Sequence, residues 1–154
     1  MSGPALVNSP GAQQLLHRIK GAWPMATLVD NSNDGIYILQ AQRFVYVNRK
    51  FVDMFGFTTD DLFAESFSIE DMLVAAESRP IIEKRQQQID AGLDVEPKYE
   101  FVAKRKDGSL TEVRVSISYI DFDGLPAAMG IVEDISERRR MERLLVARNR
   151  EVLF

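Results

Sequence analysis

The fold is decided by residues 98–136, which read KYEFVAKRKDGSLTEVRVSISYIDFDGLPAAMGIVEDIS. Asp107 and Gly108 stand between two strand-like runs, and Asp-Gly is the strongest short hairpin signal because glycine adopts positive φ freely. In the second run apolar and polar side chains alternate, which places Val113 and Val115 on one face of a strand. We therefore expect an antiparallel sheet with one face packed against a core.

A basic helix is predicted to leave this sheet directly. Residues 137–154 contain six arginines and three glutamates, a net charge of +3 in a chain whose net charge is −4. The remaining body is therefore acidic, which argues against nucleic-acid binding by the core. We interpret the arginines as a solvated helix face rather than as an arm that binds phosphate.

Length and composition indicate one soluble domain with extensions. The 154 residues are 45% hydrophobic and 27% charged, which is typical of globular proteins. No apolar run approaches the roughly 18 residues that a membrane span needs, and no secretory signal is present. The absence of cysteine excludes disulfides and thiolate metal sites. We expect a cytoplasmic protein and, since the pattern stops abruptly at Phe154, a fragment of a longer chain.

The amino-terminal residues 1–22 are predicted to form a flexible leader and an amphipathic helix over residues 13–21. Leu15, Leu16 and Ile19 share one face of that helix. Two interpretations stay open, because the stripe can pack on its own domain or against the same helix of a second subunit. We favour the dimer contact.

Short elements alternate between the leader and the final strands. Strands are predicted at 36–39 and 44–47, then three short helices, then a long helix between Ser78 and Gly92. Side chains that can cap a helix start precede the three short helices: Asn48, Thr58 and Ser68. The order β-β-α-α-α-α-β-β-β predicts an α+β fold with short helices on one face of an antiparallel sheet, flanked by N- and C-terminal helices.

Six short motifs lie along residues 25–140 in an order that resembles a known family. They are Asn33-Asp34-Gly35-Ile36, Tyr46-Val47-Asn48, Phe55-Gly56-Phe57, Arg105-Lys106-Asp107-Gly108-Ser109, Gly130, and Asp134-Ile135-Ser136-Glu137-Arg138. In this order and spacing they resemble the PAS (Per-Arnt-Sim) domain, a sensory fold of signal-transduction proteins.

The resemblance implies a five-stranded antiparallel sheet of order 2-1-5-4-3 with helices on its concave face. It divides the chain into a leader (1–22), a PAS domain (23–136) and the start of a signalling helix (137–154). It also implies a sensory and dimerisation module of a two-component system, joined covalently to an output domain such as a histidine kinase or a diguanylate cyclase.

The resemblance also points to residues that transmit a signal. The family's Asp-Ile-Thr exit motif appears here with Ser136 in place of threonine, which keeps the hydroxyl. In the family the acidic residue pairs with a following basic residue, which implies a pair of Asp134 with Arg138 or Arg139. The alternative is a plain helix cap without a signalling role.

No cofactor is predicted. Haem in this family needs an axial imidazole on the long helix, which has none, and the single histidine, His17, lies in the leader. The photochemistry of light-oxygen-voltage flavin domains needs a cysteine, and none is present. The inward positions of the last strands carry no side-chain donor for a flavin ring.

Apolar side chains between sheet and helices allow two interpretations. They enclose a cavity for an unidentified apolar small molecule, or they form a filled core, in which case the chain is a protein-protein interaction module without a ligand. Gly130 either keeps space open over the sheet or lets a helix approach. The candidate pocket residues are Ile36, Ile38, Met54, Phe55, Phe67, Met72, Ile82, Phe101, Val115, Gly130 and Val132.

No catalytic constellation is recognisable, so catalysis is expected only in a linked output domain. Glu70 and Asp71 are adjacent carboxylates. We expect one of them to contact Lys104 or Lys106 across the sheet, in a structural rather than a catalytic role. In the C-terminal stretch the dimer candidates are Met141, Leu144 and Leu145. This helix either pairs with its copy in a homodimer or folds back onto its own sheet.

Overall fold

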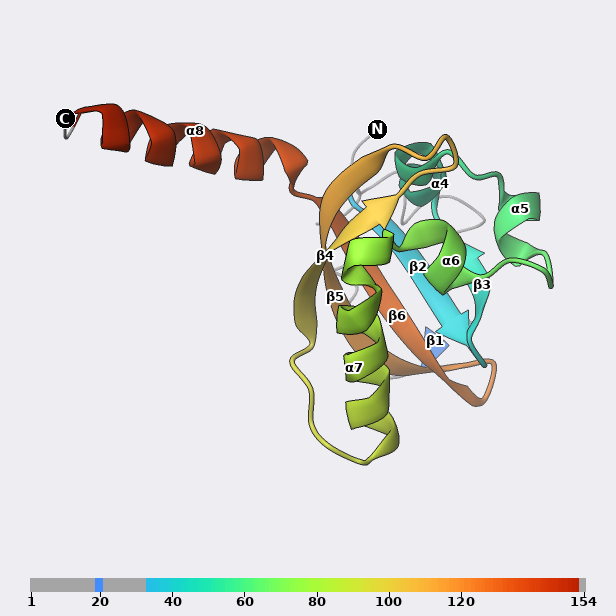
Figure 1. Ribbon diagram of the computed structural model, residues 1–154. Helices are drawn as coiled ribbons and strands as arrows, with labels where there is room; N and C mark the ends of the chain where they lie inside the picture. Colours follow the sequence, from blue (N-terminus) through green and yellow to red (C-terminus); the bar gives the residue numbers. More distant parts are fainter. Residues whose placement is uncertain (1–18, 21–32, 153–154) are drawn as a thin grey trace.

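A single antiparallel sheet forms the centre of the computed structural model, which describes residues 19–20 and 33–152 (Figure 1). The strands are β1 (Ile19–Lys20), β2 (Gly35–Gln40), β3 (Arg43–Val47), β4 (Lys98–Lys104), β5 (Leu110–Phe122) and β6 (Leu125–Asp134). The five longer strands pair in the order β3-β2-β6-β5-β4. This order is 2-1-5-4-3 along the chain, so the predicted topology is confirmed.

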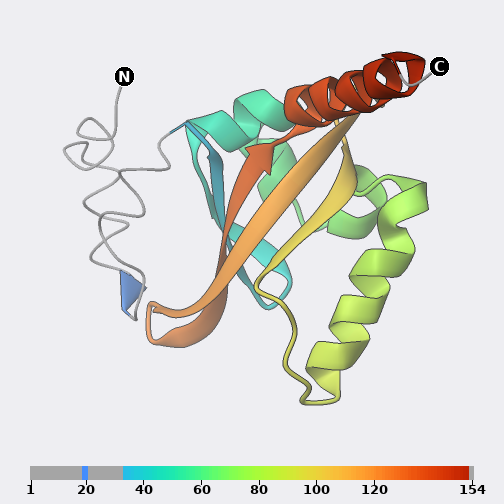
Figure 2. The same ribbon diagram turned by 90° about the vertical axis from the view of Figure 1, so that its left-hand side faces the viewer.

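Helices cover one face of the sheet (Figures 1 and 2). They are α4 (Arg49–Phe55), α5 (Thr59–Phe63), α6 (Ile69–Leu73) and α7 (Arg79–Asp90), with a 3-10 turn, η1, at Ala76–Ser78. The helices follow one another in a single block between β3 and β4, as predicted. None of the helices described within residues 33–152 is long and apolar enough to cross a membrane.

Side-chain caps fix where the short helices begin. The Asn48 carboxamide oxygen accepts from the amides of Phe51 and Ile36, both at 2.9 Å, and therefore ties the start of α4 to β2. Thr58 and Asp61 form the predicted reciprocal capping box. These contacts are local, which explains why the sequence predicts them.

Two apolar clusters lie on opposite faces of the sheet. The helix-side cluster includes Phe51, Val113 and Val132, and its aromatic rings pack edge to face. The cluster on the other face includes Ile38 and Met129, both fully buried. Strand β2 is therefore apolar on both faces.

The amino-terminal strand β1 differs from the sequence prediction. Ile19 and Lys20 were expected in an amphipathic helix but pair with Phe122 and Asp121 of β5. Backbone pairing satisfies polar groups that β5 exposes beyond the end of its partner β4. Residues 13–18 and 21, including Leu15 and Leu16, lie outside the described residues.

The exit helix α8 (Ser136–Val152) follows β6 after one residue, Ile135. The Ile135 side chain is 2% exposed, and its amide donates to the Glu112 carbonyl at 2.9 Å. Helix α8 therefore leaves the sheet without a flexible spacer, and it projects away from the body of the domain (Figures 1 and 2).

Candidate functional site

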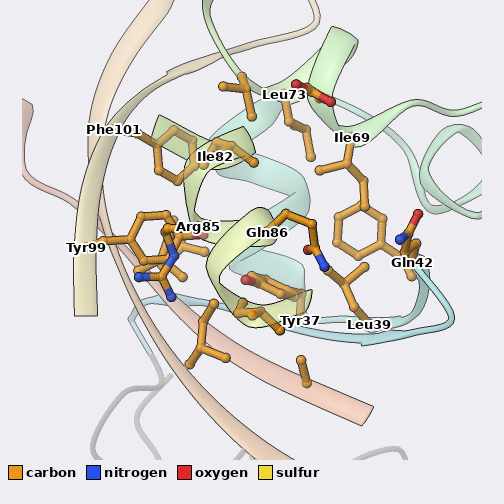
Figure 3. Close-up of a pocket in the computed structure, with 18 of the residues that line it drawn as sticks. Tyr37, Leu39, Gln42, Ile69, Leu73, Ile82, Arg85, Gln86, Tyr99 and Phe101 are labelled. Carbon is orange, nitrogen blue, oxygen red and sulfur yellow. The ribbon is translucent and has the colours of Figure 1, made fainter. Parts of the chain in front are cut away.

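A cavity of about 930 Å³ lies between the helix-covered face of the sheet and α7. Its size is near the upper end of what drug-sized ligands occupy. Side chains of β2, β4, α6 and α7 point into it, among them Tyr37, Phe101 and Ile82 (Figure 3).

The cavity exists because α7 does not pack down on the sheet. Ile82, Arg85 and Ile89 lie on one stripe of the helix and all line the cavity. These side chains stay only half-buried, and α7 has no fully buried residue. A helix whose inward stripe is incompletely covered leaves space beneath it.

Aromatic rings and one guanidinium group form the wall next to β4. The rings of Tyr99 and Phe101 stack with centroids 5.7 Å apart and planes 22° from parallel. The Arg85 guanidinium lies 3.8 Å from the Tyr99 ring centroid, and its Nη1 donates to the Glu96 carbonyl at 2.8 Å. Burial raises the pKa of Tyr37, so its hydroxyl stays protonated.

The structure brings six of the predicted pocket residues together around the cavity. They are Phe55, Phe67, Ile82, Phe101, Val115 and Val132. The predicted pocket set omitted the polar lining, in particular Arg85 and Gln86. The sequence does place both on the same helical stripe as Ile82, and this spacing is the signal that could have added them to the set.

Five predicted pocket residues lie elsewhere. Ile36 and Ile38 point to the opposite face of the sheet, because side chains alternate along β2 and the neighbouring Tyr37 faces the helices. Met54 is buried in the helix-side core outside the cavity lining, and Met72 is 37% exposed. At Gly130 the Tyr37 ring fills the space, because an added Cβ would lie 2.2 Å from Tyr37 Cζ.

The junction between β6 and α8 is held by side-chain hydrogen bonds. Asp134 Oδ1 accepts from the Ser136 amide at 2.9 Å. The Ser136 hydroxyl accepts from the Glu112 amide at 3.0 Å and shares a 2.6 Å hydrogen bond with the Thr111 hydroxyl. Partial burial raises the pKa of Asp134, but the hydrogen bonds from Ser136 and Thr111 outweigh this effect and leave that pKa below its usual value.

The predicted pair of Asp134 with Arg138 or Arg139 is wrong. Asp134 lies 3.7 Å from Arg105, which reaches it from the end of β4. Arg138 instead lies 3.7 Å from Glu133. The reason is local, since the Asp134 carboxylate turns to the free amide at the start of α8.

Charged side chains on the face opposite the cavity connect the sheet to α8. Glu100, Arg114 and Glu133 are neighbours in register across β4, β5 and β6. Arg114 Nη2 lies 2.9 Å from Glu100 Oε2, and Arg114 Nη1 lies 3.8 Å from Glu133 Oε2. These three residues, Glu112 of β5 and the three arginines of α8 that pair with the glutamates form a set that we call the charged clamp. Its members are Glu100, Glu112, Arg114, Glu133, Arg138, Arg139 and Arg143.

Three arginines of α8 each bind a different strand. Arg138 pairs with Glu133 of β6, Arg139 with Glu100 of β4, and Arg143 with Glu112 of β5. Hydrogen bonds from Arg114 and then Arg139 hold the pKa of Glu100 below its usual value. The first turns of α8 are therefore attached to three strands at once.

The lysines that were predicted to contact Glu70 or Asp71 do not pair with these carboxylates in the described residues. Lys106 pairs with Asp61 at 2.9 Å, so the predicted partner Glu70 or Asp71 is wrong for this lysine. No ion pair joins Lys104 to either carboxylate in the part of the chain that the structure describes. Glu70 lines the cavity, and a hydrogen bond with Glu83 raises the pKa of Glu70.

The predicted dimer residues on α8 are exposed. Met141, Leu144 and Leu145 of α8 are each more than half exposed. They do not fold back onto the sheet. Contacts of α8 with the sheet are made instead by Ser136 at its start and by the arginines of the charged clamp.

Within residues 19–20 and 33–152, no group of three or more histidine or acidic side chains could hold a metal ion. His17 lies outside these residues.

Comparison with known proteins identifies relatives for most of the chain. The family model described as "PAS domain" matches residues 33–137. A PAS domain of an HTR-like protein from Haloarcula marismortui is 27% identical, with 71% of this chain and 87% of that chain covered and a TM-score of 0.52. No curated protein matches the chain.

Two further structures share the fold. One is a sensory box histidine kinase/response regulator from Burkholderia thailandensis, at 14% identity and a TM-score of 0.58, covering 82% of this chain and 95% of that one. The other is the N-terminal domain of a diguanylate cyclase with PAS/PAC sensor from Marinobacter aquaeolei, at 17% identity and a TM-score of 0.54, covering 69% and 98%.

Proposed function

The chain belongs to the PAS domain family, and from this premise we propose that it is a sensory module that couples a ligand pocket to its exit helix. A small molecule binds in the cavity beneath α7. Its binding changes the positions of β4, β5 and β6, and these strands re-aim α8. Catalysis belongs to a separate output domain.

One observation carries this proposal: cavity-lining residues alternate with residues of the charged clamp along the same strands. Phe101, Val115 and Val132 line the cavity. Each directly follows or precedes a clamp residue on the other face: Glu100, Arg114 and Glu133 respectively. Because neighbouring side chains of a strand point to opposite faces, a shift of one strand moves both its cavity-lining residue and its clamp residue.

The coupling requires two states that the ligand distinguishes. A ligand that fits the cavity better in one arrangement of the strands shifts the population toward that arrangement. The ion pairs to Arg138, Arg139 and Arg143 then change together, because they bind three different strands. Rotation or translation of α8 is the output of the module.

The proposed partner of α8 is the same helix of a second copy. Leu144 and Leu145 are exposed on the projecting part of the helix, where a parallel partner would cover them. Structural relatives include a histidine kinase and a diguanylate cyclase by their descriptions. An output domain of either kind, linked through α8, fits a helix that transmits rotation.

Native mass spectrometry tests the proposed pocket. Freshly purified protein should retain a small molecule that is released on denaturation, and Ile117→Trp, which fills the cavity lining, should abolish it. Ser118→Trp, at the exposed next position of β5, is the matched control and should retain the molecule. Protein that is empty, and that Ile117→Trp destabilises as it would an already filled core, would instead favour a protein-protein interaction module.

A further inference from the structure

We infer that the cavity takes an organic anion with a flat, apolar body, and that Arg85 binds its acidic group. This inference rests on the proposed ligand-binding role of the cavity and names the chemical class of the ligand. It follows from the position of one guanidinium group, from the tyrosines of the same lining and from the aromatic rings beside them.

Arg85 is held at the cavity wall rather than extended into solvent. Its guanidinium lies over the Tyr99 ring at 3.8 Å, and Nη1 donates to the Glu96 carbonyl at 2.8 Å (Figure 3). An arginine fixed in this way has lost its side-chain freedom before a ligand arrives. Binding of an anion therefore costs less entropy.

Arg85 differs from other arginines of the domain in its charged neighbours. Arg105 and Arg114 lie within ion-pair distance of Asp134 and Glu100 respectively. In the part of the chain that the structure describes, no carboxylate forms such a pair with Arg85. A half-buried guanidinium without a carboxylate is completed by an anionic ligand, since charge-assisted hydrogen bonds are the strong ones.

Tyrosine side chains line the same cavity as Arg85. They are Tyr37, Tyr99 and Tyr119. Arg85 also interacts with Tyr37 and Tyr99. Tyr37 is 8% exposed, and its ring lies over Gly130 on the helix-covered face of the sheet.

The acidic residues of the lining are engaged elsewhere. Asp90 accepts a hydrogen bond from Gln86 at 2.9 Å. The neighbouring Glu83 raises the pKa of Glu70, so the Glu70 carboxyl holds a proton more readily. Glu83 is two residues from Arg85 on α7, so the two side chains do not face each other.

The aromatic side chains of the cavity lining determine which kind of ligand body fits. The near-parallel rings of Tyr99 and Phe101 present an extended flat surface beside Arg85, and Phe44 and Phe67 add further rings to the lining. Aromatic walls of this kind favour planar, apolar groups. The volume of about 930 Å³ admits a body of at least two fused rings.

A matched pair of fluorescent probes tests the inference. 8-Anilinonaphthalene-1-sulfonate and N-phenyl-1-naphthylamine share a skeleton, but only the first is an anion. The wild-type protein should bind the anion about tenfold or more tightly than the neutral dye. Arg85→Gln should remove this preference. Arg85→Lys, which keeps the charge but not the planar guanidinium with its paired N–H donors, should retain part of it.

Lys84→Gln is the control variant, because it removes the same charge from the adjacent residue of α7, outside the cavity lining. It should leave the preference intact, and circular dichroism should show that all variants are folded. Equal affinity for both dyes, or a preference that survives Arg85→Gln, would overturn the inference.

The cavity-filling variant Ile117→Trp separates failure of the inference from failure of the proposed function. If it weakens both dyes equally while no anion preference exists, the pocket stands and only the ligand class is wrong. If it leaves both affinities unchanged, the dyes bind elsewhere and the inferred anion site is refuted together with the pocket.

Discussion

Gly130 leaves room for a tyrosine ring to pack against one face of the sheet. It pairs in register with Tyr37 of β2, and the Tyr37 ring lies over it on the helix side. Sequence reasoning expected open space or the approach of a helix at this glycine. The structure shows that a cross-strand side chain fills the position, which a single sequence does not reveal because the two residues are far apart in the chain.

Gly130→Ala should destabilise the domain by about 1–3 kcal/mol, the usual cost of overpacking a core. The added methyl group would lie 2.2 Å from Tyr37 Cζ, so the ring must move. Urea unfolding measures the free energy. In a Tyr37→Leu background the same substitution should cost clearly less, and equal costs in both backgrounds would show that the ring is not the obstacle.

Glu100→Gln should lower stability at neutral pH by less than about 1 kcal/mol, because the carboxylate is partly exposed and its ion pairs are screened by solvent. The pKa of Glu100 is depressed in the folded state, so its contribution is complete above the ordinary value of 4.5. It is lost as the pH falls through the depressed value.

Urea unfolding of the wild type and Glu100→Gln at neutral pH and at pH roughly 3 checks this sign. The difference between the two proteins should shrink at the lower pH. Glu142→Gln, which removes an exposed carboxylate that pairs with the same Arg139 within α8, should show a smaller effect at neutral pH. A difference that grows on acidification would contradict the ion-pair explanation.

At the scale of the elements, local signals predict structure well and nonlocal pairings less well. The capping box at Thr58 and the exit of α8 from β6 depend on residues a few positions apart, and both are confirmed. Strand β2 reads Ile36-Tyr37-Ile38-Leu39 and is apolar on both faces, so alternation cannot say which residues face the helices. The prediction for Ile36 and Ile38 was wrong for that reason.

Asp134→Ala should loosen the junction and leave the sheet folded. The substitution removes the acceptor of the Ser136 amide and the partner of Arg105. Hydrogen exchange resolved by residue should show faster exchange at Ser136 and unchanged protection in the centre of β5 and β6. In a full-length protein with an output domain, regulation should be lost.

Asp134→Asn keeps an oxygen that can cap Ser136 and is the matched control for the junction. It should restore protection of the Ser136 amide in large part. If Asp134→Ala leaves both the exchange and the regulation unchanged, the junction does not transmit the signal.

At the scale of the whole molecule, the sequence left open whether there is a cavity or a filled core, and it did not predict the charged clamp. The cavity depends on how far α7 stands from the sheet, which is set by packing of side chains from separate elements. The clamp depends on register across β4, β5 and β6, which brings Glu100, Arg114 and Glu133 together. The sequence did predict the fold in which both arise.

Replacing Leu144 and Leu145 together by glutamate should prevent the proposed dimer. Burial of a leucine contributes roughly 1.5–3 kcal/mol, so the double substitution should weaken association by about a hundredfold or more. Sedimentation equilibrium measures this dissociation constant. Arg140→Gln, an exposed substitution on the same helix, should have little effect. An unchanged dimer in the double variant would exclude this face as the contact.

The central claim is that α8 is held in a fixed direction by three strands. The chain contains no cysteine, so cysteines introduced at Ser118 of β5 and Val146 of α8 can carry spin labels without background. Double electron-electron resonance, with excess unlabelled protein to suppress contacts between labelled copies, then measures the sheet-to-helix distance. The account predicts one narrow distance distribution that broadens when Arg139 and Arg143 are both replaced by glutamine. A distribution that is already broad in the wild-type background, or that the two substitutions leave unchanged, would contradict it.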